Sequence, residues 1–184
     1  MGHKNILDAE RAALLVVDVQ EAFRSVIPEF ELLASRISIV VRGFQTIGLP
    51  IFVTEQYPKG LGRTAEEILL ALPDDFPIIE KTAFSSCSLG LVDIFREARI
   101  SQVVICGLET HVCVNQTAHD LLDVGFQIHL LTDAVASRFE HDRAAGIAKM
   151  TNSGVLASSV EMALFELLKD SSHEKFNSIQ QLIK

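Results

Sequence analysis

A cysteine between an expected strand and an expected helix is the residue best placed for chemistry in this chain. Residues 103–106 are apolar and largely β-branched, Gly107 ends that run, and Cys113 follows a polar turn at the start of a helical pattern. The unpaired N–H groups and the dipole of a helix N-terminus favour a thiolate over a thiol. We therefore expect Cys113 to be a nucleophile at the carboxyl end of a strand, where open α/β sheets bind their ligands.

Two charged side chains follow apolar segments in the same way. Asp18 comes directly after the apolar run 12–17, and Lys81 ends the short extended segment 77–81. A cysteine nucleophile needs a nearby cation to lower its pKa and a group that takes and returns protons. Lys81 suits the first role and Asp18 the second. The structural alternatives are a helix cap for Asp18, a solvated lysine for Lys81 and a small packed side chain for Cys113.

Strands that alternate with helices must position these groups. We expect strands at 12–17, 51–54, 77–81, 102–106, 126–131 and 155–157, and helices at 30–47, 65–72, 88–99, 110–124, 140–152 and 159–169. Residues 56–63 are expected to form a loop, and residues 171–184 a weak helix or a tail. This alternation predicts a mostly parallel sheet with helices on both faces and functional groups at the carboxyl ends of its strands.

Composition and charge limit the class of function. The chain has 184 residues, 48% of them hydrophobic and 22% charged, which favours one domain over 1–184 with a sizeable core. A net charge of -8 without a Lys/Arg cluster argues against nucleic acid as a partner, and no apolar run is long enough to cross a membrane. Three cysteines without metal-like spacing favour a reduced, cytoplasmic location, with an organelle matrix as the alternative.

Three segments in this order resemble the isochorismatase-like cysteine hydrolase superfamily. They are LVVDVQEAF at 15–23, EKTAFS at 80–85 and GLETHVCV at 107–114. The segment VTEQYPKGLG at 53–62 resembles the isochorismatase domain-containing subgroup, and DAVASR at 133–138 also matches. The resemblance spans about residues 10–170. It implies a Rossmann-like, three-layer α/β/α sandwich around a mostly parallel sheet of about six strands.

The resemblance also implies a catalytic triad of Asp18, Lys81 and Cys113. It further implies a cis peptide bond between Leu108 and Glu109, which would aim the backbone N–H groups of Glu109 and Cys113 at an oxyanion. The implied reaction is metal-independent hydrolysis of a small amide through a thioester on the cysteine. A vinyl ether, the bond cleaved in the isochorismate branch, is the alternative substrate. Relatives form dimers or larger assemblies, so a homo-oligomer is expected.

The chain departs from the nicotinamidase branch at the metal site. That branch has an Asp-x-His motif and a further histidine, whereas the matching residues here are Glu55, Gln56 and Tyr57. We therefore expect no metal site of that kind and no other cofactor, and nicotinamide is not the favoured substrate.

Five residues are candidates for the wall of the substrate pocket: Gln20, Phe23, Glu55, Tyr57 and Phe84. The amide of Gln20 would hydrogen-bond Asp18 or the substrate, and Phe23 and Phe84 would exclude water. Ordinary core packing is the alternative for the aromatic residues, and a solvated carboxylate is the alternative for Glu55.

A catalytically silent protein of this fold, acting as an interaction module, is the competing function. The intact set of Asp18, Lys81 and Cys113 favours an enzyme with a small-molecule substrate. A site without activity has no physical need of a lysine near a buried carboxylate.

Overall fold

The computed structural model describes residues 3–184, apart from the side chains at positions 88 and 89. Six parallel strands form one sheet in the order β3-β2-β1-β4-β5-β6. They are β1 (Ala12–Val17), β2 (Ile51–Gln56), β3 (Ile78–Lys81), β4 (Gln102–Gly107), β5 (Gln127–Val135) and β6 (Leu156–Ser158). The predicted fold class is therefore confirmed, and the strands of this sheet are all parallel.

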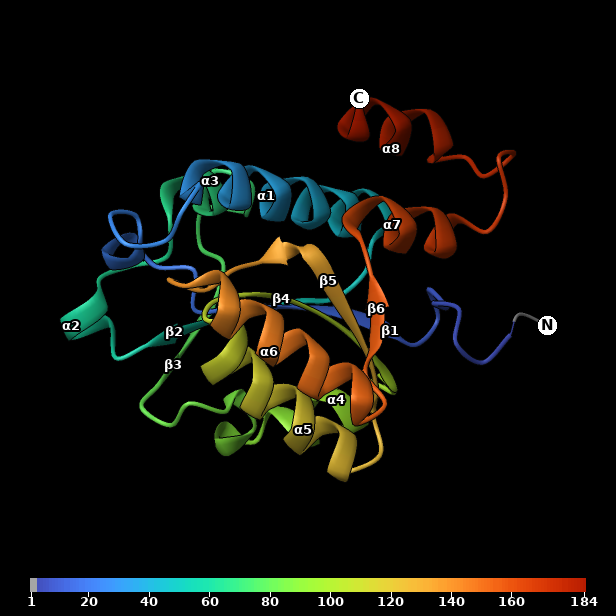
Figure 1. Cartoon of the computed structure of the whole chain (residues 1–184). Helices are drawn as coiled ribbons and strands as arrows, with labels where there is room; N and C mark the ends of the chain where they lie inside the picture. Colours follow the sequence, from blue (N-terminus) through green and yellow to red (C-terminus); the bar gives the residue numbers. More distant parts are fainter. Residues whose placement is uncertain (1–2) are drawn as a thin grey trace.

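Helices cover both faces of the sheet (Figure 1). One face carries α1 (Phe30–Ile47), α3 (Glu66–Leu69), α7 (Val160–Leu168) and α8 (Phe176–Ile183), and the other carries α4 (Leu91–Glu97), α5 (Asn115–Asp123) and α6 (Glu140–Asn152). The short helix α2 (Pro58–Leu61) projects beside the sheet, and three further single turns are η1 (Glu21–Phe23), η2 (Ser86–Leu89) and η3 (Thr110–Val114). Among residues 3–184, no helix is long and apolar enough to cross a membrane.

Strand β1 lies at the centre of the sheet and is buried along its whole length. Its side chains alternate between two apolar cores: Leu14 and Val16 pack on the α1 and α7 face, and Leu15 and Val17 on the α4 and α5 face. A strand that is buried on both faces needs apolar residues at every position. This requirement explains why the segment has an unbroken apolar run rather than an alternating pattern.

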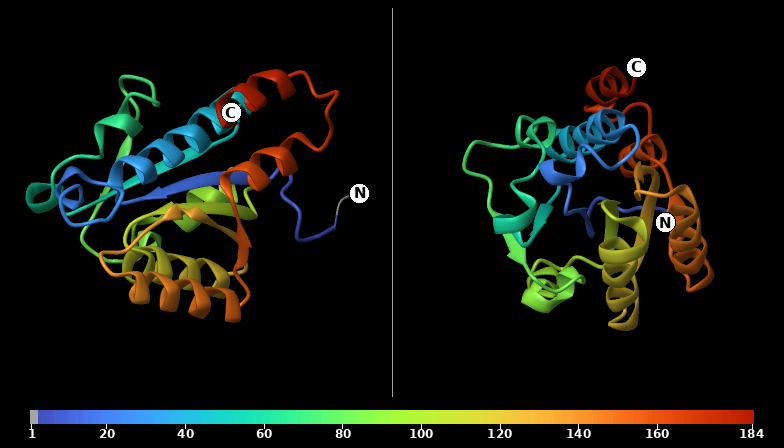
Figure 2. Two further views of the ribbon diagram at one scale, coloured as in Figure 1. Left: turned by 45° about the horizontal axis from the view of Figure 1, so that its top comes forward. Right: turned by 60° about the vertical axis from the view of Figure 1, so that its left-hand side comes forward.

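The expected elements are present, but several have different bounds. Helices α1 and α6 have the predicted limits, whereas β5 continues to Val135 and the expected loop at 56–63 contains α2. The predicted helix at 110–124 begins as the π-helical turn η3. The C-terminal segment is helix α8 rather than a tail, and Figure 2 shows it lying along α1. Its residue Ile179 is fully buried in the same core as α1, which explains why it is ordered.

The strand order places a topological switch between β1 and β4. The chain continues from β1 to β2 on one side and from β4 to β5 on the other, and the register pairs Val17 with Gly107. Gly107 has a φ of 118°, and a Cβ atom there would lie 2.1 Å from the carbonyl oxygen of Val17. Only glycine fits this close approach. Ligands of open α/β sheets bind at such a switch, so the loops after β1 and β4 are the expected place for a site.

Candidate active site

Asp18 and Lys81 form a buried ion pair at the carboxyl ends of β1 and β3. Lys81 Nζ donates to Asp18 Oδ2 over 2.6 Å, and the side chains of Lys81 and Asp18 are 0% and 1% exposed, respectively. The other carboxylate oxygen of Asp18 accepts from the Thr54 hydroxyl at 2.7 Å, and the Asp18 N–H donates to the Thr54 carbonyl. Asp18 itself has a φ of 53°, an unusual conformation for a residue other than glycine. A residue with an unusual backbone conformation, whose two carboxylate oxygens each accept a hydrogen bond, is typical of a functional site.

Three further acceptors surround the Lys81 ammonium. They are Gln56 Oε1 at 2.9 Å and the carbonyl oxygens of Ala83 at 3.2 Å and Phe84 at 2.9 Å. The Gln56 amide also donates to the Thr82 carbonyl, so its own orientation is fixed. Together with Asp18, these acceptors fix the position of the Lys81 ammonium. The sequence reasoning gave Gln56 no role at the site, because its contact with Lys81 depends on the register of β2 with β3.

Cys113 joins this pair from the π-helical turn η3 between β4 and α5. The residue is 7% exposed, and the charges of both Asp18 and Lys81 act on its thiol. The structure thus brings together the three residues that the sequence proposed as the reactive set. A π-helical turn places an extra residue in one turn, and such turns occur frequently at functional sites.

The surroundings favour the thiol form of Cys113 over the thiolate. Burial raises the pKa of Cys113 to about 12, and the negative charge of Asp18 contributes to the increase. Lys81 acts in the opposite direction, because a nearby cation stabilises the thiolate, but it does not outweigh the other two effects. We expected Lys81 and the helix terminus to hold Cys113 as, or close to, a thiolate, whereas the larger effect of burial favours the thiol.

The other two cysteines lie away from the ion pair. Cys106 is fully buried in β4, its sulfur lies 3.9 Å from the Leu15 carbonyl oxygen, and burial raises its pKa. Cys87 is half-buried, its sulfur lies 3.9 Å from the Thr117 carbonyl oxygen, and its pKa is also raised by burial. Cys113 is the cysteine that interacts with a charged pair.

The backbone before Cys113 is trans, contrary to the prediction. Every peptide bond among residues 3–184, including that between Leu108 and Glu109, is trans. The chain instead changes direction at Gly107, whose φ of 118° is open to glycine. The Leu108 N–H then donates to the Val17 carbonyl at 2.8 Å. We call residues 109–114 the nucleophile turn.

The N–H groups of Glu109 and His111 in the nucleophile turn have no acceptor in the described part of the chain. Val112 N–H and Val114 N–H both donate to the Glu109 carbonyl, and Thr110 N–H donates to the Ala136 carbonyl. No such bond is found for the Glu109 N–H within residues 3–184. That the Glu109 N–H binds an oxyanion stays a prediction of the sequence resemblance.

Two polar pocket candidates are occupied by contacts within the protein. Gln20 is fully buried, and its amide donates to the carbonyls of Gln56 and Gly62 and accepts from the Gln56 N–H. Glu55 accepts from both the N–H and the hydroxyl of Thr64, at 2.5 and 2.6 Å. Among the described residues, the Gln20 side chain therefore bonds to Gln56 and Gly62 and not to Asp18, which was one of its expected partners. Both Gln20 and Glu55 fix the loop after β2, which packs beside the ion pair.

The three aromatic candidates lie at different depths. Phe23 is partly buried and packs against the core on the α1 face. Tyr57 and Phe84 are 54% and 53% exposed, and each lines a surface hollow, of about 340 Å³ and 490 Å³ respectively. The Tyr57 hollow includes Lys81. Tyr57 thus lines a hollow that includes Lys81, and Phe84 belongs to the segment whose carbonyls bind Lys81, whereas Phe23 has the alternative role of core packing.

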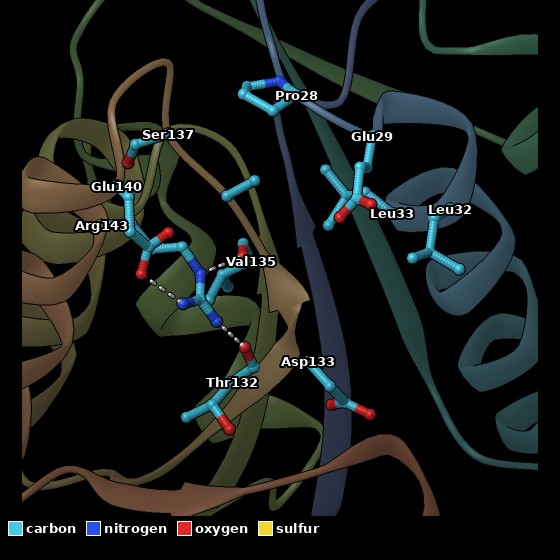
Figure 3. Close-up of a pocket in the computed structure, with 11 residues that line it drawn as sticks. Pro28, Glu29, Leu32, Leu33, Thr132, Asp133, Val135, Ser137, Glu140 and Arg143 are labelled. Carbon is cyan, nitrogen blue, oxygen red and sulfur yellow. Dashed lines mark hydrogen bonds and ion pairs between the residues drawn. The ribbon is translucent and has the colours of Figure 1, made fainter.

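A separate hollow lies at the end of β5, between α1 and α6 (Figure 3). Its volume is about 380 Å³, and its walls include Leu32, Leu33 and Val135. The Arg143 guanidinium in it is bonded to the carbonyls of Thr132 and Val135 and to Glu140, as Figure 3 shows. None of the Asp18, Lys81 and Cys113 side chains lines it. It is distinct from the candidate site.

Comparisons with known proteins give a family and several structures of the same fold. The Isochorismatase domain family model matches residues 12–162. Isochorismatase domain-containing protein 2A of Mus musculus is 35% identical over 175 residues, which are 95% of this chain and 84% of the mouse protein. The structure of MAR1 ribonuclease from Caenorhabditis elegans is 35% identical, with a TM-score of 0.92, and the match covers 97% of this chain and 92% of that one.

A more distant structure shares the fold alone. The ycaC gene product of Escherichia coli, described as an octameric hydrolase of unknown specificity, is 22% identical with a TM-score of 0.89. The match covers 100% of this chain and 91% of that one. From the family match, the identity to the mouse protein and the shared six-stranded architecture, we conclude that this chain belongs to the isochorismatase family.

Proposed function

We propose that the protein is a metal-independent cysteine hydrolase that cleaves a small amide through a thioester on Cys113. The observation that carries this proposal is the buried Asp18–Lys81 ion pair, which interacts with the Cys113 thiol at the topological switch of the sheet. Burying two charges costs free energy even when they form an ion pair, and the stability of the fold does not require such a pair. A role in catalysis explains why it is present. The site combines a nucleophile (Cys113), a base (Asp18) and a cation (Lys81) in a buried environment, and acyl transfer through a cysteine uses groups of these kinds.

The first step is proton transfer from Cys113 to Asp18 as the sulfur attacks. Because burial raises the pKa of Cys113 to about 12, the resting residue carries its proton, and a base must remove it during attack. The Asp18 carboxylate is the base whose charge acts on that thiol, and it takes the proton. The sulfur then forms a bond to the carbonyl carbon, and the carbonyl π electrons move to oxygen. Lys81 stabilises the negative charge while it lies on sulfur.

The second step releases the amine and the third restores the enzyme. The oxyanion collapses, the C–N bond breaks, and Asp18 gives its proton to the leaving nitrogen. A water molecule then attacks the thioester carbon while Asp18 takes one of its protons. The C–S bond breaks, the acid leaves, and the proton on Asp18 returns to the sulfur. The net reaction is addition of one water across a C–N bond.

Backbone N–H groups of the nucleophile turn would bind the oxyanion. The Glu109 N–H has no acceptor among the described residues and lies in the same turn as the sulfur. The Cys113 N–H is the second donor we propose. Donors that are fixed in advance stabilise an oxyanion strongly in a dry site.

The test is hydrolysis of a panel of small primary and N-substituted amides, measured as amine or ammonia release. Intact-protein mass spectrometry after acid quenching would detect an acyl adduct on Cys113. We expect hydrolysis and adduct in the wild type and in Cys106→Ala, the matched control, but neither in Cys113→Ala. Activity that survives Cys113→Ala, or that EDTA removes, would contradict the proposal.

RNA and a vinyl ether serve as comparison substrates in the same assay. The name of the C. elegans structure concerns RNA cleavage, but the net charge of -8 here opposes binding of a polyanion. A vinyl ether such as isochorismate would be cleaved without amine release. Absence of turnover with every substrate, together with an unreactive Cys113, would favour the interaction-module alternative.

A further inference from the structure

Three successive residues after β5 form hydrogen bonds with the nucleophile turn. We call residues 136–138 the clamp. The Ala136 carbonyl accepts from both the N–H and the hydroxyl of Thr110, each over 2.9 Å. The Ser137 hydroxyl lies 3.0 Å from Nδ1 of His111. These residues belong to the motif DAVASR, to which the proposed mechanism gives no role.

The third clamp residue, Arg138, holds the first residue of the turn. Its backbone N–H and its Nε both donate to one oxygen of Glu109, at 3.1 and 3.0 Å. The Glu109 side chain is 8% exposed, whereas that of Arg138 is 51% exposed. A carboxylate at that depth requires a partner, because an unpaired buried charge is strongly destabilising. Arg138 is the cation that compensates it.

We propose that Arg138 is a positioning residue for oxyanion binding, acting through Glu109; this inference rests on the proposed function. Glu109 carries both the carboxylate that accepts from Arg138 and an N–H group without an acceptor in the described residues. Fixing the side chain restrains the peptide group that bears this N–H. Pairing also neutralises a buried negative charge that would otherwise repel the developing oxyanion.

A small aldehyde such as propionaldehyde is a suitable probe, because it needs no knowledge of the natural substrate. The Cys113 sulfur adds to the carbonyl carbon, and the thiol proton ends on oxygen, which gives a hemithioacetal. The reaction is reversible and leaves the oxygen where the oxyanion of an amide would lie. A ¹³C-labelled carbonyl carbon reports the adduct by NMR, and Cys113→Ala should give none.

Arg138→Ala should weaken aldehyde binding by about tenfold or more, since a small displacement of an oxyanion donor has effects of this size. The rate of Cys113 alkylation by iodoacetamide, which needs no oxyanion donor, should stay within about twofold. Arg138→Lys should recover part of the affinity. Arg96→Ala, which removes an arginine from an exposed pair with Asp93, is the matched control and should change neither quantity.

A double-mutant cycle tests whether Arg138 acts through Glu109. In a Glu109→Ala background, Arg138→Ala should have no further effect on aldehyde binding, because the charge and the anchored side chain are already gone. An unchanged affinity in Arg138→Ala would overturn the proposal. A parallel fall in aldehyde affinity, alkylation rate and melting temperature would also overturn it, because that result indicates a purely structural role. If the wild-type thiol alkylates but forms no adduct, the proposed function fails as well.

Discussion

Lys81 Nζ lies 2.6 Å from Asp18 Oδ2, although 63 residues separate the two in the chain and both side chains are buried. The pair is formed because β1 and β3 are parallel and both end at the same edge of the sheet. Strand β2 separates them, and Thr54 and Gln56 of that strand each bond to one member of the pair. The ion pair therefore depends on the carboxyl ends of three neighbouring strands, β1, β2 and β3.

Removing one member of the pair should destabilise the protein. Lys81→Met leaves a buried carboxylate without its cation, and we expect a loss of about 3–5 kcal/mol in the free energy of unfolding. The double variant Asp18→Asn/Lys81→Met removes both charges and should lose less than Lys81→Met alone. Urea denaturation measures each value. Arg96→Met, in an exposed pair, should change the free energy by less than about 0.5 kcal/mol.

The same pair should shift the pKa of Cys113 in opposite directions. Burial raises that pKa to about 12, Asp18 contributes to the increase and Lys81 reduces it. Asp18→Asn should therefore lower the pKa and Lys81→Met should raise it. Thiolate absorbance near 240 nm, taken as the difference from the matching Cys113→Ser protein, measures the pKa directly. A wild-type value near the ordinary value of about 8.5 would contradict our account of the buried thiol.

Gly107 should be intolerant of a side chain. Its φ is 118°, and a Cβ atom at this position would lie 2.1 Å from the Val17 carbonyl oxygen, so Gly107→Ala must separate β1 from β4. We expect a loss of more than about 4 kcal/mol in the free energy of unfolding, or no folded protein. Gly48→Ala is the control, because Gly48 also has a positive φ but no atom near its Cβ position. That change should cost about 1–2 kcal/mol.

Sequence patterns located the three candidate residues because each lies at or after the end of a strand, and strand ends of a parallel sheet share an edge. They could not show that Glu55 turns to Thr64, since that contact depends on the fold of the loop that begins after β2. The role of Gln56 was missed for a similar reason, because it depends on register between strands. The protonation of Cys113 depends on a balance between burial and two opposite charges, which spacing alone does not reveal.

His129 should make the protein sensitive to acid. It is 2% exposed in β5, and its Nε2 is buried without a partner in the described residues. Burial lowers the pKa of His129 to about 4, and the positive charge of Arg11 contributes to this decrease. The folded-state pKa is thus below the unfolded value of about 6.5. As the pH falls below about 6.5, the unfolded chain binds a proton that the folded protein excludes.

The stability that neutral His129 contributes is therefore complete above about pH 6.5 and is lost as the pH falls towards about 4. The loss should reach about 3 kcal/mol, since each pKa unit corresponds to about 1.4 kcal/mol. His129→Leu should flatten the dependence of the free energy of unfolding on pH across this range, as measured by urea denaturation at several pH values. His141→Leu, at a side chain that is 77% exposed, should leave the wild-type slope. Equal slopes in wild type and His129→Leu would show that other groups cause the acid sensitivity.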